Sequence, residues 1–216
     1  GAETNYVFGA LLIAQLVALP IFAKASAKFG KKNTFLMAVA WWILMMFFSF
    51  LIGPESHNSL IYIFGACVGF GTGGVVVMMY SIFPDVPDID ELYSGKRQEG
   101  IYSGLITFTR KVGSAFGIFI VSQVISLAGY VKPVEKVIDG TKKIVKQPQT
   151  PEFIFVLKTI FAVMPVIFLC FCAYNIIRYR LTPELHNQLN KYLTAKRAGE
   201  VVDEAEGERI KLALQR

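Results

Sequence analysis

The residues best suited to chemistry form a polar stripe within an apolar run in the middle of the chain. Its members recur at helical spacing: Ser103, Thr107, Arg110, Lys111 and Ser114. Positions i, i+4, i+7/8 and i+11 share one face of an α-helix. Lys111 lies about eleven residues into the run, roughly 16 Å along a helix, and half of a hydrocarbon core is about 15 Å. We therefore expect two cations near the midplane of a membrane, facing a water-filled cavity or an acidic partner rather than lipid.

Two interpretations of these cations stay open. In the first, the stripe lines a binding site, where an Arg suits bidentate pairing with a carboxylate and a Lys acts as a point charge. In the second, both cations only form structural ion pairs with other helices. The apolar runs of this chain hold no Asp or Glu, so such partners would lie outside it. Gly113 and Gly117 would let a neighbouring helix approach this one.

A second charged stretch, Phe83–Gly100, separates two long apolar runs. It offers candidates for ion pairs at the inner membrane surface: Asp85, Asp88, Glu91, Arg97 and Glu99. The first acids follow one run, and the last two charges lead directly into the run that carries Lys111. We interpret this stretch as an inner-side hinge that one rigid helix connects to the midplane.

The composition is that of a membrane protein. The chain is 54% hydrophobic and 18% charged, with a mean hydropathy of +0.48, whereas soluble domains carry about a quarter charged residues. Five apolar runs could each cross a bilayer: Val7–Ala23, Leu36–Ile52, Leu60–Phe83, Gly100–Tyr130 and Phe153–Ile177. We expect an all-α membrane protein with five transmembrane helices within residues 1–181, and a cytoplasmic part over residues 182–216.

The cytoplasmic part opens with helix-start residues. Thr182, Pro183 and Glu184 provide an N-cap, a first-position proline and a first-turn acid. Leucines then recur at every fourth position: Leu185, Leu189 and Leu193. The spacing predicts a short amphipathic helix on the inner membrane surface, followed by a charged tail.

Basic residues indicate the orientation. Four lysines crowd the connection between the first two runs: Lys24, Lys28, Lys31 and Lys32. The Gly53–Leu60 turn holds no Lys or Arg, so the positive-inside rule places the N-terminus outside and the C-terminus in the cytoplasm. The outer connection Val131–Thr150 runs against this rule with five lysines: Lys132, Lys136, Lys142, Lys143 and Lys146. The other connections and the tail favour the orientation given.

The third apolar run carries a glycine pattern. Gly65, Gly69 and Gly73 form two overlapping GxxxG steps. In lipid, such small residues allow the backbones of two helices to approach closely. The pattern predicts a helix-packing face, which is compatible with a substrate contact on the same helix.

Several function classes find no support in the sequence. The net charge of +6 comes mostly from bases at the ends of apolar runs, which is typical of membrane anchors and argues against nucleic-acid binding. Three cysteines lie inside apolar runs without the spacing of disulfides or a zinc site: Cys67, Cys170 and Cys172. Neither His57 nor His186 has a ligand set or catalytic triad near it in sequence. We expect no metal site, no cofactor and no enzymatic activity.

The stretch PDVPDIDELYSGKRQEG resembles a family signature. It is similar to the inner-loop motif of the glycoside–pentoside–hexuronide:cation symporters, the melibiose-permease family of the major facilitator fold, roughly D-x-x-D-x-x-E-x-x-x-G-x-R-x-E-[GS]. The matching positions are Asp85, Asp88, Glu91, Gly95, Arg97, Glu99 and Gly100. The chain departs from the usual pattern at Pro87 and Ile89, neither of which removes a charge. RKVGSAFGIF, IIRYRLTPELHNQLNKYL and PIFAKASAKFGKKNTF resemble other parts of the family, so the likeness covers nearly the whole chain.

The resemblance implies the C-terminal half of a twelve-helix symporter of the bacterial inner membrane, as helices eight to twelve without the seventh. Lys111 then matches the characteristic lysine of the eleventh helix, and Thr107 a polar position near the sugar. The main cation and sugar aspartates of the family lie in the N-terminal half, which would be the partner of this chain. Val75, Val76 and Val77 stand where some relatives present an aromatic residue to the sugar.

The leading hypothesis is secondary active transport of a sugar or glycoside together with Na⁺ or H⁺, by alternating access between two halves. One alternative is a carrier of a lipid or another amphiphile, which competition by sugars would distinguish. Another is a non-transporting membrane scaffold that docks a partner through its GxxxG helix.

Overall fold

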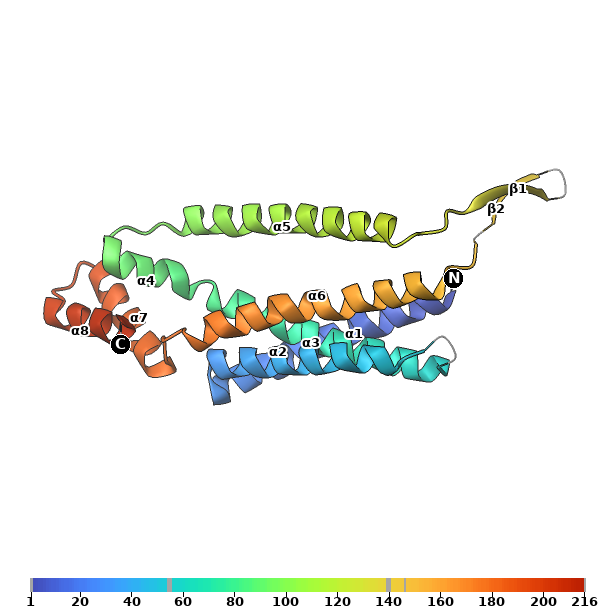
Figure 1. The fold of residues 1–216 in the computed structure, drawn as a ribbon. Coiled ribbons are helices and arrows are strands. Elements are labelled where there is room, and N and C mark those ends of the chain that lie inside the picture. The colour runs from blue at the N-terminus through green and yellow to red at the C-terminus, as the bar shows by residue number, and fades with distance from the viewer. Residues whose placement is uncertain (1, 54–55, 139–140, 146, 216) are drawn as a thin grey trace.

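The computed structural model describes residues 2–53, 56–138, 141–145 and 147–215. Within them, five helices are long and apolar enough to cross a membrane. These are α1 (Ala2–Phe29), α2 (Lys31–Phe48), α3 (Asn58–Ile82), α5 (Glu99–Leu127) and α6 (Pro151–Ile177). Their axes run side by side, with α5 set apart from the other four (Figure 1). The expected all-α membrane fold is confirmed.

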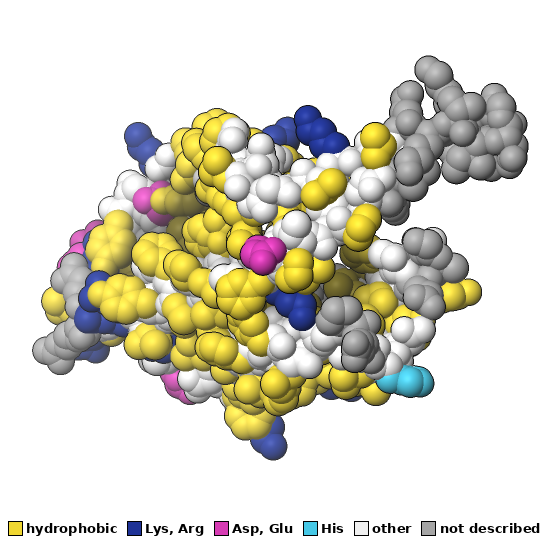
Figure 2. Space-filling model, turned by 45° about the vertical axis from the view of Figure 1, so that its right-hand side comes forward, with side chains coloured by type: hydrophobic (Ala, Val, Ile, Leu, Met, Phe, Trp, Pro, Cys, Tyr) yellow, Lys and Arg dark blue, Asp and Glu magenta, His cyan; other side chains and the backbone are white. Residues whose placement is uncertain are grey.

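The outside of the molecule is apolar. Hydrophobic side chains make up most of the face that Figure 2 shows. Large residues on several helices are exposed, among them Leu127 at 86% and Ile118 at 67%. Soluble monomers rarely expose apolar patches of this extent, so the surface suits lipid better than water.

Four of the long helices share one core. It is formed by side chains from α1, α2, α3 and α6: Ala18, Phe22, Phe35, Ala38, Val39, Met78, Ile82 and Leu169. The three glycines of the GxxxG steps lie against α1, whereas Gly71 lies against α2. A Cβ atom built on Gly69 would overlap the carbonyl oxygen of Leu11, and one on Gly73 would lie 2.8 Å from that of Gln15. Only glycine at these two positions permits this close helix approach.

The connection between the first two spans is shorter than expected. Helix α1 continues to Phe29, so Lys24 and Lys28 lie on its last turns rather than in a loop. Gly30 alone makes the turn, with a φ of 79° that favours glycine, and Lys31 begins α2. The residues Ala23–Lys28 are mostly Ala and Lys, which are strong helix formers, and this explains the extension.

The polar stretch expected as a hinge contains a helix of its own, α4 (Asp85–Ser94). Two acids occupy its first turn and Gly95 ends it in the left-handed conformation, with a φ of 67°. Helices α7 (Pro183–Arg197) and α8 (Glu204–Gln215) pack around α4 at the end of the molecule that holds the C-terminus (Figure 1). We call α4, α7 and α8 the inner helix cluster.

The predicted start of α7 is confirmed, and its apolar face packs against α4 and α8. The Thr182 hydroxyl accepts a hydrogen bond from the Leu185 amide at 3.2 Å, as the capping residues predict. The recurring leucines are buried within the inner helix cluster rather than free to lie on lipid. The cluster core is Leu92, Leu181, Leu185, Leu189, Tyr192, Leu193 and Ile210. Helices α4 and α8 thus cover the apolar face of α7, and the expectation that α7 lies on the inner membrane surface stays a prediction.

A β-hairpin lies at the opposite end of the molecule. Strands β1 (Val134–Ile138) and β2 (Thr141–Val145) are antiparallel, with Val134 opposite Val145 and Ile138 opposite Thr141. Strands were not expected in this connection. Three of the five lysines in this connection lie on the strands, and Lys146 lies outside the described residues. The hairpin is at the end that holds the N-terminus (Figure 1).

Candidate functional site

The polar stripe lies on α5, a helix without a single buried side chain. Its side chains are all exposed: Ser103, Thr107, Arg110, Lys111 and Ser114. The Thr107 hydroxyl donates a hydrogen bond to the Ser103 carbonyl oxygen at 2.8 Å, one turn earlier. No atom of another element lies within 4 Å of a Cβ atom built on Gly113 or Gly117. The described chain thus brings no helix against the two glycines that were expected to admit one.

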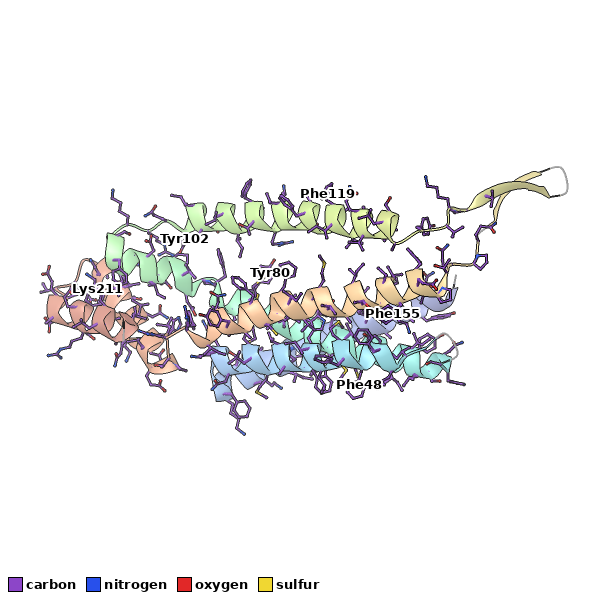
Figure 3. The ribbon with its side chains drawn as sticks, viewed as in Figure 1. Phe48, Tyr80, Tyr102, Phe119, Phe155 and Lys211 are labelled. Carbon is purple, nitrogen blue, oxygen red and sulfur yellow. The ribbon has the colours of Figure 1, made fainter. Side chains whose placement is uncertain are left out.

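Arg110 reaches across to α3. Its Nη1 atom donates to the Tyr80 hydroxyl oxygen at 2.6 Å. Tyr80 is two residues from the end of α3 and lies in the space between α5 and α6 (Figure 3). The Arg110 backbone is about 16 Å along α5 from Glu99. The expectation that its head group lies near the midplane of a membrane stays a prediction.

Lys111 is placed differently from its neighbour. Among the described residues it forms no hydrogen bond or ion pair, and neither it nor Arg110 contacts a carboxylate of the described chain. Successive residues on a helix point about 100° apart, so the two charges do not share one direction. The structure brings Arg110 to Tyr80 and leaves Lys111 exposed.

Asp85 is the most enclosed acid of the candidate set, with only 4% of its side chain exposed. Lys31 donates to both of its carboxylate oxygens, at 2.7 and 2.8 Å. The Tyr179 hydroxyl donates to Oδ2 at 2.9 Å, and His186 Nε2 lies 3.2 Å from Oδ1. Four segments therefore meet at this carboxylate: the start of α2, the start of α4, the connection just after α6 and the first turn of α7.

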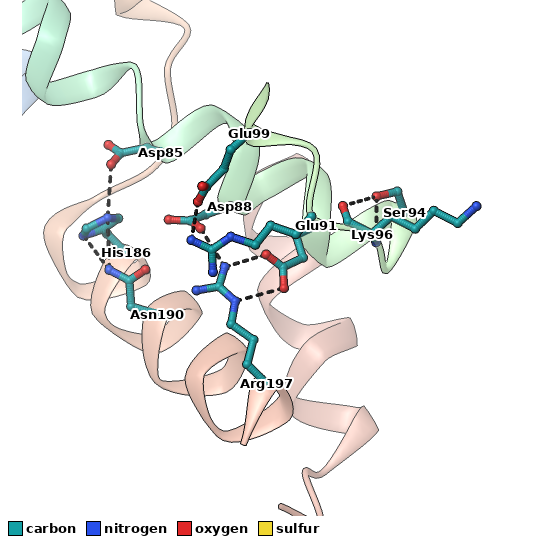
Figure 4. Close-up of polar contacts among 10 residues, drawn as sticks. Asp85, Asp88, Glu91, Ser94, Lys96, Glu99, His186, Asn190 and Arg197 are labelled. Atoms are coloured by element: carbon teal, nitrogen blue, oxygen red, sulfur yellow. Dashed lines mark hydrogen bonds and ion pairs between the residues drawn. The ribbon is translucent and has the colours of Figure 1, made fainter. Parts of the chain in front are cut away.

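Asp88 and Glu91 share one partner on α7. Arg197 Nη2 donates to Asp88 Oδ1 at 2.9 Å, and its Nε donates to Glu91 Oε1 at 3.0 Å, as Figure 4 shows. Arg97 pairs with Glu99 at the start of α5. The five charged residues expected at the inner side thus divide among three ion-pair groups, and no single group holds them all.

Two pKa values follow from these contacts. The hydrogen bond to Glu91 raises the pKa of the Arg197 guanidinium above its ordinary high value, and Asp88 adds to the effect. Burial raises the pKa of the Tyr179 phenol, and the adjacent Asp85 carboxylate raises it further. Both groups therefore keep their protons at every pH relevant to a cell.

The partners of Asp85 were not expected from the sequence. Lys31 was interpreted as part of a membrane-anchoring cluster, and His186 had no expected role. No pattern in the sequence indicated a role for Tyr179. Together they border a pocket of about 620 Å³ where α1 ends, α2 begins and the chain leaves α6. No group of His, Cys, Asp and Glu within the described chain could hold a metal ion.

The fold and the site define an integral membrane protein of long apolar helices, with one polar helix face and a charged cluster at one end. The family model of MFS/sugar transport proteins matches residues 1–183. The chain belongs to this family.

Curated relatives agree with the assignment. The chain is 28% identical over 193 residues to a glucuronide carrier protein homolog of Escherichia coli, across 88% of this chain and 38% of the relative. It is 25% identical over 181 residues to an uncharacterized symporter of Synechocystis, across 84% and 32%. A putative sulfoquinovose importer of Escherichia coli is 31% identical over 128 residues, across 58% and 26%. The chain thus spans less than half the length of the curated relatives it matches.

Proposed function

We propose that this chain forms the C-terminal part of a secondary active sugar transporter. One observation carries the proposal: within a chain of the MFS/sugar transport family, α5 holds a hydroxyl-and-cation stripe but buries no side chain. A polar face in a membrane helix needs water, substrate or a polar partner beside it, because lipid satisfies none of its groups. An N-terminal half and a sugar between the two halves would supply that environment.

The stripe forms this chain's side of the substrate site. Hydroxyls of Ser103, Thr107 and Ser114 can exchange hydrogen bonds with sugar hydroxyls. Lys111 and Arg110 can donate hydrogen bonds to sugar oxygens or form ion pairs with a carboxylate of the other half. Transport then proceeds by alternating access, in which the two halves rock about this site.

The inner charges act as the gate. Five charged residues lie on α4, in the connection that follows it and at the start of α5, where the cytoplasmic ends of two halves would meet: Asp85, Asp88, Glu91, Arg97 and Glu99. The pairs of Asp88, Glu91, Arg97 and Glu99 are partly solvent-exposed, so they can exchange partners without a large barrier. Asp85 is enclosed and keeps its partners, so it anchors the gate instead of exchanging. Because α5 is one unbroken helix from Glu99 to Leu127, a change at the gate moves the stripe as well.

The driving force is a gradient of Na⁺ or H⁺, with the main cation site in the N-terminal half. Three groups of bases lie at the end that carries the inner helix cluster: the lysines of the α1–α2 turn, Arg178 and Arg180 just after α6, and the bases of α7. By the positive-inside rule this end is cytoplasmic, and the N-terminus of the chain is outside. The membrane would be the plasma membrane of a bacterium.

Gradient-driven uptake tests the proposal. Vesicles containing the full-length transporter would receive radiolabelled glycosides under an imposed Na⁺ gradient, an imposed H⁺ gradient, or neither. We expect accumulation above the equilibrium level under one gradient, abolished by an ionophore for that ion. Uptake that never exceeds equilibrium would contradict symport. Transport of amphiphiles that sugars do not inhibit would favour a lipid-type carrier.

A further inference from the structure

The pocket beside the inner helix cluster gathers bases from three segments. Its volume is about 620 Å³, and it lies where α1 ends, α2 begins and the chain passes from α6 into α7. The described residues of its lining include three permanently charged bases, one histidine and one acid: Lys31, Lys32, Arg180, His186 and Asp85. Neutral side chains that can donate hydrogen bonds line it as well, namely Ser26, Asn33 and Asn187. The polar part of the pocket is therefore rich in donors.

The charge of Lys32 is not matched by an acid. Its neighbour Lys31 is matched, since the Lys31 Nζ atom contacts both carboxylate oxygens of Asp85. Lys32 instead donates to two uncharged acceptors, the carbonyl oxygens of Ile177 at 2.6 Å and Tyr179 at 3.1 Å. Within the described chain it forms no ion pair. An ammonium group has three hydrogens, so Lys32 keeps one donor and its positive charge for a ligand.

Two other bases of the lining favour an anion. A guanidinium carries five N–H donors in a planar fork, so Arg180 can bind a ligand in addition to other acceptors. His186 lies beside Asp85, with its Nε2 atom 3.2 Å from Oδ1 (Figure 4), and protonation would add its charge to the lining. A phosphate group accepts several charge-assisted hydrogen bonds at once, and Arg and Lys are its usual partners. The lining thus suits a phosphate better than a neutral ligand.

The pocket lies at the level of the lipid head groups. Helices α1, α2 and α6 are long and apolar enough to cross a membrane, and their ends at this pocket are Phe29, Lys31 and Ile177. The ends of membrane-spanning helices reach the head-group region, where basic pockets between helices bind anionic phospholipids. Phe29 and Leu181 give the pocket apolar edges that an acyl chain could contact. A soluble phosphate ester would reach the same bases from the aqueous side.

We infer that this pocket binds the phosphate group of an anionic phospholipid or of a soluble phosphate ester, and that the bound phosphate holds the α1–α2 turn to the α6–α7 connection. The ligand is not the transported substrate, because no described residue of α5 lines the pocket. The inference goes beyond the proposed transport and does not depend on it. The competing explanation is that Lys32 only caps the last carbonyl groups of α6.

Thermal unfolding of the full-length transporter in detergent tests the inference. Tm would be measured with phosphatidylglycerol against phosphatidylcholine of the same acyl chains, and with glycerol phosphate against sodium chloride at equal ionic strength. We expect phosphatidylglycerol, glycerol phosphate or both to raise Tm by at least about 5 °C over their controls, because a ligand that binds only the folded state stabilises it. A rise with phosphatidylglycerol alone assigns the pocket to lipid, and a rise with glycerol phosphate assigns it to soluble esters as well. No rise with either probe would overturn the inference.

Substitutions within and beside the pocket locate the binding. Lys32→Gln should weaken the apparent affinity for the effective probe about tenfold, and the double variant with Arg180→Gln should lose the rise in Tm. Asn187→Asp should also remove the rise, because it adds a negative charge to the lining at an exposed position and leaves every base in place. Arg178→Gln is the matched control, since Arg178 also follows α6 but lies over the Tyr174 ring outside the pocket. It should keep the whole rise.

Two results with these variants would overturn the inference. If Lys32→Gln lowered Tm by the same amount with and without the probe, Lys32 would only cap α6. If Arg178→Gln lost as much of the rise as the pocket variants, the probe would be attracted to the basic surface as a whole. Because no transport is measured, either result leaves the proposed function untouched.

Discussion

Replacing Lys31 by methionine tests whether Asp85 is a buried anchor that ties four segments together. Lys31 donates to both Asp85 oxygens and to the Ser81 carbonyl oxygen at 2.9 Å. Methionine preserves most of the side-chain volume and removes the charge and the donors. The variant would leave an enclosed carboxylate with Tyr179 and His186 as its remaining partners.

The expected loss can be worked from the geometry. Removing one partner of a buried ion pair costs about 3–5 kcal/mol. Lys31 is 29% exposed and two other groups still contact the carboxylate, so we expect about 2–3 kcal/mol here. For a protein of this size, 1 kcal/mol corresponds to roughly 2–4 °C in Tm. Lys31→Met should therefore lower Tm by about 5–10 °C.

Thermal unfolding in detergent, followed by circular dichroism, measures this loss. Lys28→Met is the matched control, since Lys28 is exposed on the preceding turn and lies only over the ring of Phe29. It should leave Tm unchanged. Adding Asp85→Leu to Lys31→Met should recover part of the loss, because no unpaired charge remains. Equal Tm values for the wild type and Lys31→Met, or a further fall in the double variant, would refute the reasoning.

Two further predictions concern the gate and the helix packing. Arg197→Gln removes the guanidinium that Asp88 and Glu91 share. It should shift the balance between inward-facing and outward-facing states, measured by the alkylation rate of a cysteine on the inner side, more than it changes substrate affinity. An unchanged alkylation rate would contradict the gate. Gly69→Val places a Cβ against the backbone of Leu11 and should lower Tm by more than about 5 °C, roughly the effect of an overpacked core. The control is Gly104→Val, whose Cβ meets no atom within 4 Å and which should lower Tm less. Similar Tm values for the two variants would contradict the α1–α3 packing.

Much of the fold could be predicted because it follows from local pattern. The lengths of the apolar runs predicted the five membrane-spanning helices, and Thr182 with Pro183 predicted the start of α7. Helix α4 was missed although its signals were present, with acids in its first turn and a glycine just after its end. Two prolines and the density of charge made the stretch read as a connection. The hairpin of residues 134–145 has no hydrophobic alternation strong enough to stand out in a lysine-rich segment.

Five charged residues of the candidate gate could be named from the sequence, but their main partners on α2, α6 and α7 could not. Lys31 and Asp85 are 54 residues apart, and Arg197 lies 109 residues from Asp88. Which base meets which acid depends on how the helices pack, and the sequence carries no local trace of it. The same holds for Tyr80 and Arg110, which lie 30 residues apart on α3 and α5.

Substrate protection of the α5 stripe tests the central claim most directly. Thr107→Cys would be made in the full-length transporter after its native cysteines are replaced, and its alkylation by a maleimide would be followed with and without the transported glycoside. Phe108→Cys is the control, because Phe108 is 65% exposed on the same turn but outside the stripe. We predict that substrate slows alkylation of Thr107→Cys and leaves Phe108→Cys unaffected. Equal rates with and without substrate at Thr107→Cys, under conditions where uptake is measured, would contradict the account.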